Sequence, residues 1–159
     1  MNIKKWQIFA SIFCLILGTI LHFTYEWFNY NVIVGLFSTI NESVWEHLKL
    51  LFYPMFFISI IGYFKIGRKL CNYWYAQMYG IVFALIFVVV FFYTYTGIIG
   101  TNFFIIDIFT FVFAVLIGEY ISYKIMNSEE QSTKATKIMS IIILVVLTIY
   151  FVLFTFVTA

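Results

Sequence analysis

Charged residues are scarce in this sequence, at 10% of its 159 positions, whereas apolar residues make up 64%. So few charges could not cover the surface of a soluble protein with this much apolar material, which excludes a water-soluble globular domain. A membrane-spanning helix needs about 20 mainly apolar residues. The length therefore predicts one transmembrane domain over residues 1–159, with the lipid bilayer around it and no separate soluble domain.

The low net charge and the few cysteine and proline residues limit the possible functions and structural features. The net charge is only +2 and the basic residues are scattered, which excludes nucleic acid as a partner. The two cysteines lie far apart, Cys14 within the first apolar run and Cys71 in a basic loop, so we expect neither a disulfide nor a cysteine metal site. The only proline, Pro54, predicts a bend in the second span, because it lacks the N–H that a helix needs there.

Apolar runs divide the chain into five predicted transmembrane helices, at about 6–28, 44–64, 74–96, 103–123 and 138–159. The apolar stretch from Val32 to Phe37, between the first two, is too short to cross a membrane. It is expected to lie at the interface or to re-enter the bilayer. The predicted fold class is therefore all-α, a polytopic membrane helical bundle with a short interfacial or re-entrant segment after the first span.

Lys and Arg residues cluster at alternate ends of these spans. The clusters lie within residues 4–5, 65–69 and 124–137, whereas the loops at 29–43 and 97–102 contain no basic residue. Short basic loops remain on the cytoplasmic side of a membrane. The pattern thus predicts a cytoplasmic N-terminus and an extracytoplasmic C-terminus.

Ionisable side chains crowd the outer ends of the first two predicted helices, where membrane proteins rarely place them without a function. His22 and Glu26 are four residues apart and share one helix face, while Glu46 and His47 lie near the start of the next helix. Adjacent antiparallel helices would bring all four to a similar depth. Imidazole and carboxylate ligands suit zinc, manganese or iron, so these residues predict a divalent-metal site or a proton relay.

Five further polar residues are expected to surround that site as a polar network: Glu42, Ser43, Tyr93, Tyr95 and Asp107. A structural interpretation exists for some of them. Asn41 or Ser43 suits a helix N-cap, and with Ser43 in that role Glu46 takes the capping-box position. Asp107, near the start of the fourth helix, would also complement its dipole.

Glu119 is expected to behave differently, because it lies near the opposite end of the fourth predicted helix. Lys124 is only a turn or so away along the chain. We therefore expect Glu119 to pair with a base or to extend towards the headgroups.

Three stretches carry a resemblance to a known family: His22–Trp27, Asn41–Lys49 and Tyr93–Gly97, which read HFTYEW, NESVWEHLK and YTYTG. They resemble the DUF6512 family of small bacterial integral membrane proteins, and the resemblance covers about residues 16–107. It implies a location in the bacterial cell membrane and implies that these residues are a feature of the family. It implies no substrate and no catalytic residue.

Three classes of function remain open. Binding of a divalent cation or of protons, linked to transport or sensing, is favoured; five helices are few for a transporter, so a homo-oligomer or a membrane partner subunit is expected. A structural or accessory membrane protein comes second. A metal-dependent membrane hydrolase, with Asp107 or a remaining glutamate as general base, comes third. The chain contains neither a His-Glu-x-x-His nor a Gly-x-Ser-x-Gly motif.

Overall fold

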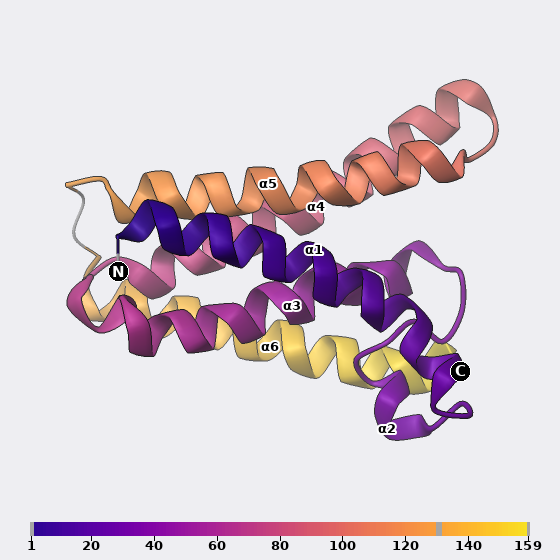
Figure 1. Cartoon of the computed structure of the whole chain (residues 1–159), viewed down its shortest axis with the longest axis horizontal. Helices are drawn as coiled ribbons and strands as arrows, with labels where there is room; N and C mark the ends of the chain where they lie inside the picture. Colours follow the sequence, from indigo (N-terminus) through magenta and orange to yellow (C-terminus); the bar gives the residue numbers. More distant parts are fainter. Residues whose placement is uncertain (1, 130–131, 159) are drawn as a thin grey trace.

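The computed structural model describes residues 2–129 and 132–158, which form helices and connections without any strand (Figure 1). The elements are α1 (Ile3–Trp27), α2 (Val32–Gly35), α3 (Val44–Lys65), the 3₁₀ turn η1 (Gly67–Lys69), α4 (Tyr73–Ile99), α5 (Phe104–Met126) and α6 (Lys134–Thr158). Five of these helices, α1, α3, α4, α5 and α6, are long and apolar enough to cross a membrane. The predicted five-span helical bundle is therefore confirmed.

Several helix ends differ from the predicted bounds by three or four residues, and local capping explains two of these differences. α4 continues to Ile99, and Gly100 ends it with a left-handed φ of 86° while its N–H donates to the carbonyl of Thr96 at 2.7 Å. α6 begins at Lys134, ahead of its apolar run, because the Thr133 hydroxyl accepts the N–H of Thr136 at 3.1 Å. Polar first turns of this kind lie outside a hydropathy window.

α3 is the central helix of the bundle, packed against α1, α4, α5 and α6. Its middle is fully enclosed, with Leu51, Phe52 and Tyr53 at most 1% exposed. The helix runs unbroken through Pro54, and the bend expected there stays a prediction.

α4 and α5 lie side by side over much of their length (Figure 1). Gly80 and Gly118 face each other so closely that a Cβ on Gly80 would lie 2.5 Å from the Gly118 carbonyl oxygen. Beside them, the Ser122 hydroxyl donates to the carbonyl of Ala76 at 3.1 Å. Small residues that let two backbones approach are typical of helix contacts in membranes.

The connection between α1 and α3 folds back onto the end of α1. Asn31 caps the short α2 by accepting the N–H of Ile33 at 2.9 Å. The Ser38 hydroxyl donates to the carbonyl of Leu21, and that of Thr39 donates to the carbonyl of His22 at 3.3 Å. These bonds hold the connection against the helix that carries His22.

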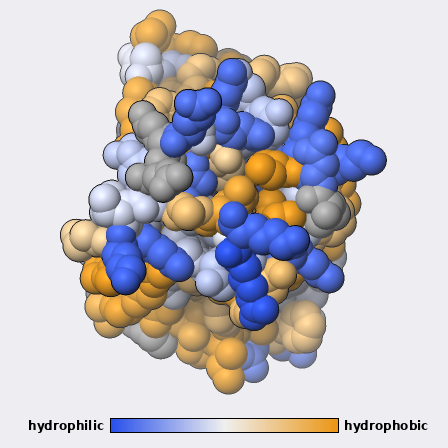
Figure 2. All heavy atoms as spheres, turned by 90° about the vertical axis from the view of Figure 1, so that its left-hand side faces the viewer, coloured by the Kyte–Doolittle hydropathy of each residue, from blue (hydrophilic) through white to orange (hydrophobic). Residues whose placement is uncertain are grey.

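The two ends of the bundle differ in charge. One end comprises the start of α1, the α3–α4 connection and the α5–α6 connection, and we call it the basic end. Its exposed basic residues are Lys4, Lys5, Lys65, Arg68, Lys69, Lys124 and Lys134. Figure 2 looks onto this end, where hydrophilic side chains surround an apolar patch. The opposite end, with the end of α1, α2 and the start of α3, is called the histidine end.

Candidate metal site and buried ion pair

The start of α3 places the acidic and histidine residues of the second span. Ser43 is the N-cap, and its hydroxyl accepts the N–H of Glu46 at 3.3 Å. The Asn41 side chain supports this turn by accepting the N–H of Ser43 at 3.0 Å. Because Glu46 and His47 are consecutive in the helix, they point about 100° apart, and the structure sends them into different surroundings.

His47 faces His22 of α1, and Glu42 joins the two histidines. The ring centroids of His22 and His47 are 5.3 Å apart, and Nε2 of His47 lies 3.5 Å from a carboxylate oxygen of Glu42. One possible ligand atom from each of the three residues lies within 4.8 Å of the others. We call these three residues the histidine cluster.

The histidine cluster has free ligand capacity. Nδ1 of His22 is shielded from solvent and has no hydrogen-bond partner among the described residues. Nδ1 of His47 lies 2.9 Å from the carbonyl oxygen of Ser43, which leaves Nε2 turned towards Glu42. The Glu42 side chain is 85% exposed, so the cluster is open on one side.

The separations suit a metal after small side-chain rotations. Zinc binds imidazole nitrogen and carboxylate oxygen at about 2.0–2.2 Å, so two ligands of a tetrahedral ion lie roughly 3.3–3.6 Å apart. The His47–Glu42 separation of 3.5 Å already matches that value. His22 would have to approach by rotation of its side chain, and three protein ligands would leave a position open for water or another group.

Glu46 does not join the histidine cluster. Its carboxylate forms an ion pair with the ammonium group of Lys49 at 2.6 Å, and both side chains are fully buried. We expected Glu46 to share one site with His22. The structure instead places Glu46 against Lys49, which lies three residues further along the same helix face. A buried carboxylate is held most favourably by the nearest cation.

The ion pair also fastens the connection between α1 and α3. The Lys49 ammonium donates to the carbonyl of Gly35 at 2.8 Å and to the hydroxyl of Thr155 in α6 at 3.0 Å. The same Glu46 oxygen accepts the N–H of Ile40 at 3.0 Å. One buried pair therefore joins α3, the α2 segment and α6, and the extra hydrogen bonds offset part of its desolvation.

The remaining predicted site residues are not among the three whose ligand atoms converge. Glu26 is exposed on α1 and Tyr93 is 62% exposed on α4. Asp107 accepts hydrogen bonds from the Tyr95 hydroxyl and from Asn102, the latter at 3.2 Å. Tyr95 and Asp107 thus close the α4–α5 turn, which Figure 1 shows projecting away from α2.

Glu119 was not anticipated as a buried residue. It is 3% exposed between α5 and α1, where it accepts a hydrogen bond from Gln7 at 2.6 Å. The Lys124 ammonium instead lies 5.7 Å from the centre of the Tyr120 ring. Gln7 and Cys14 are seven residues apart, which puts them on one face of α1. A pair of polar residues on one face of an apolar run could have indicated that this face points inwards.

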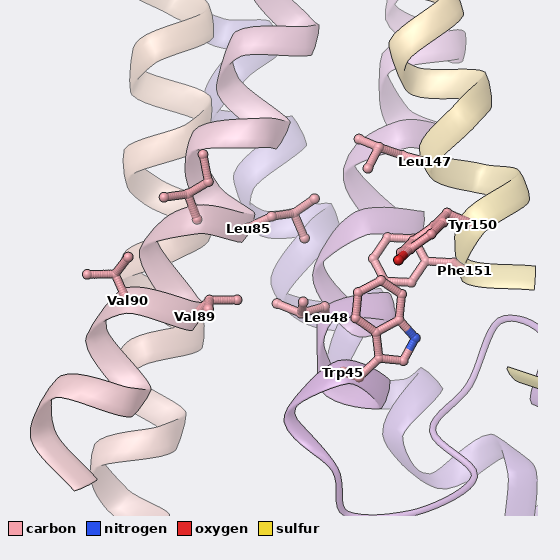
Figure 3. Close-up of a pocket in the computed structure, with 9 residues that line it drawn as sticks. Trp45, Leu48, Leu85, Val89, Val90, Leu147, Tyr150 and Phe151 are labelled. Atoms are coloured by element: carbon pink, nitrogen blue, oxygen red, sulfur yellow. The ribbon is translucent and has the colours of Figure 1, made fainter. Parts of the chain in front are cut away.

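An apolar groove of about 290 Å³ lies between α3, α4 and α6 (Figure 3). Trp45 of α3 forms one wall and packs against Phe151 of α6 with ring centroids 4.9 Å apart. Leu48, Leu85 and Val89 are among the other lining residues. The described lining contains no His, Cys, Asp, Glu, Lys or Arg side chain, and its one hydroxyl belongs to Tyr150.

The comparisons with known proteins give a family and no activity. No curated protein and no solved structure matches the chain. The family DUF6512, described as a family of unknown function, matches residues 1–159 and so extends the resemblance carried by the stretches around His22 and His47. The chain therefore belongs to the DUF6512 family.

Proposed function

We propose that this membrane protein binds a divalent metal ion, zinc, manganese or iron, at the histidine cluster. The observation that carries the proposal is the convergence of two imidazoles and one carboxylate, with ligand atoms within 4.8 Å of one another. Imidazole and carboxylate are ligands that all three metals accept. The ligands proposed are His22, His47 and Glu42, so Glu42 takes the place first expected for Glu26 and Glu46.

The unpartnered nitrogen of His22 supports this assignment. Shielded polar atoms in proteins almost always have a partner, and one that lacks it calls for an explanation such as a bound ion. A metal ion would supply that partner. The open side at Glu42 supplies a path by which the ion enters and leaves.

The proposed orientation follows from the charges at the two ends. Basic segments remain in the cytoplasm, so the basic end faces inwards and the histidine cluster lies at the outer face of a bacterial cell membrane. A reversible outer site suits uptake or sensing of the ion. With three protein ligands the ion keeps an open position, which a second copy of the chain or a membrane partner subunit could fill during transfer.

A structural or accessory role is the second candidate. The buried pair of Glu46 and Lys49 supports it, because the pair joins three parts of the fold and all its contacts are internal. In that case the histidine cluster would only share protons.

Metal binding by the detergent-purified protein distinguishes the two. We would titrate the chain with Zn²⁺, Mn²⁺ and Fe²⁺ by calorimetry and measure bound metal by elemental analysis after desalting. His47→Ala and Glu42→Gln remove one ligand each, and Glu26→Gln is the matched control, since Glu26 is an exposed acid on the same end.

We expect binding by the parent and by Glu26→Gln, and at least a roughly 100-fold weaker affinity for His47→Ala, because one of three ligands is lost. No binding by the parent, or equal binding by all variants, would refute the metal site and favour the structural role.

A further inference from the structure

A second buried carboxyl group lies near the basic end, far along the bundle from the histidine cluster. Glu119 of α5 contacts Gln7 and Cys14 of α1, and all three side chains are at most 5% exposed. The Gln7 amide nitrogen donates to the Glu119 carboxylate at 2.6 Å and to its main-chain carbonyl at 3.1 Å. The Cys14 thiol lies 3.9 Å from the other carboxylate oxygen.

In the part of the chain that the structure describes, this carboxyl group has no cationic partner. Among the described residues, no Lys, Arg or His nitrogen lies within 4.0 Å of Glu119, in contrast to Glu46 with Lys49. The titratable groups that face Glu119 are the Cys14 thiol of α1 and the Tyr73 phenol of α4. The Tyr73 hydroxyl donates to the carbonyl of Ser59 in α3 at 2.7 Å, so it is already engaged.

An ionised carboxylate without a counter-ion is strongly disfavoured in a low dielectric, and such a group binds a proton instead. Gln7 offers a partner for that proton. The amide oxygen of Gln7 is buried and has no hydrogen-bond partner among the described residues. The oxygen and nitrogen of a glutamine amide exchange places by a half-turn of the side-chain amide.

We propose that Glu119 is an intramembrane proton-binding site and that Gln7 adapts to its protonation. When the carboxylate is ionised, the Gln7 amide nitrogen and the Cys14 thiol donate to it. When the carboxylate takes one proton from water at the basic end, its O–H donates to the Gln7 amide oxygen after the amide turns. The proton is the only ligand, and no bond other than O–H forms or breaks.

This site is independent of the metal site proposed above, since its residues belong to α1 and α5 near the basic end. Ionisable groups buried in membrane helices commonly mark proton or ion pathways. Glu119 is placed to exchange protons with the compartment that the basic end faces.

Infrared spectroscopy of the full-length protein in lipid nanodiscs tests the proposal directly. We expect the carbonyl stretching band of a neutral carboxylic acid at about pH 7, where exposed carboxyl groups are ionised. The band should be lost in Glu119→Gln, which keeps the shape of the side chain. In Gln7→Leu it should move to higher frequency, because the acid loses its hydrogen-bond acceptor. A parent spectrum identical to that of Glu119→Gln from about pH 5 to pH 9 would overturn the proposal.

Chemical labelling of the unmodified parent avoids any folding defect of the variants. A hydrophobic carbodiimide reacts with protonated carboxyl groups, and peptide mass spectrometry locates the adduct. We expect the adduct on Glu119 and not on Glu46, which is as deeply buried but paired with Lys49. An adduct on Glu46 with none on Glu119 would overturn the proposal.

Discussion

Two buried glutamates lie near opposite ends of this bundle and have different neighbours. Glu46 and Glu119 are 0% and 3% exposed, yet Glu46 touches the ammonium group of Lys49 and Glu119 touches a neutral amide and a thiol. The first is stabilised as an anion by a cation one helical turn away. The second has no such neighbour among the residues that the structure describes, and a proton takes the place of the counter-ion. The difference therefore lies in the partner supplied by the fold.

The largest expected effect concerns the orientation of the two ends in the membrane, because a reporter enzyme fused to the chain is either active or inactive. Alkaline phosphatase fused after Ala159 should be active and a fusion after Ser128 inactive, since the enzyme matures only outside the cytoplasm and basic loops remain inside. Activity of the two fusions in isolated cells is the measurement. The reverse pattern would place the histidine cluster and Glu46 at the cytoplasmic face and Glu119 at the outer face.

Among the stability measurements, we expect the largest effect when the cation beside Glu46 is removed. Lys49→Met leaves a buried carboxylate without its partner, and we expect a loss of about 3–5 kcal/mol in the free energy of unfolding. Denaturation in mixed micelles measures it. The double variant Lys49→Met with Glu46→Gln should recover most of the loss, because no unpaired charge then remains. A Lys49→Met protein as stable as the parent would contradict the account of the pair.

Lowering the pH should weaken metal binding at the histidine cluster whether or not Glu119 is present. Neutral imidazole and ionised carboxylate are the metal-binding forms, so protons compete with the metal at the histidine cluster. We expect metal affinity to fall as the pH is lowered, because binding releases protons from the ligands. Calorimetry on the parent and on Glu119→Gln should give the same decrease. A decrease that disappears in Glu119→Gln would instead couple the two ends.

The smallest effect is expected for Glu119→Gln on stability. If the carboxyl group is neutral, an amide of the same shape replaces it and still donates a hydrogen bond to Gln7, so the free energy of unfolding should change by less than about 1 kcal/mol. The same micelle denaturation measures it. A loss as large as that of Lys49→Met would mean that Glu119 is ionised and paired in the folded protein.

The candidate site was predictable in part. The four-residue spacing in the first span and the adjacent Glu46 and His47 indicated a polar cluster at one end, and the structure brings His22 and His47 together there. Glu42 rather than Glu26 completes the cluster, because the chain turns back at the Ser43 cap and carries Glu42 towards His47. Such a turn is not encoded in helical periodicity.

The sequence by itself determined the number of membrane spans, their approximate bounds and the basic character of one end, because hydrophobic length and the placement of Lys and Arg are local properties of the chain. Only the tertiary structure decided the long-range partners of the buried polar groups. Glu119 meets Gln7 across 112 positions and Lys49 meets Thr155 across 106. Contacts between residues so far apart in the chain depend on which helix faces pack together. When all sides of an apolar helix are similar in hydropathy, the sequence carries little periodic pattern that would identify the packed face.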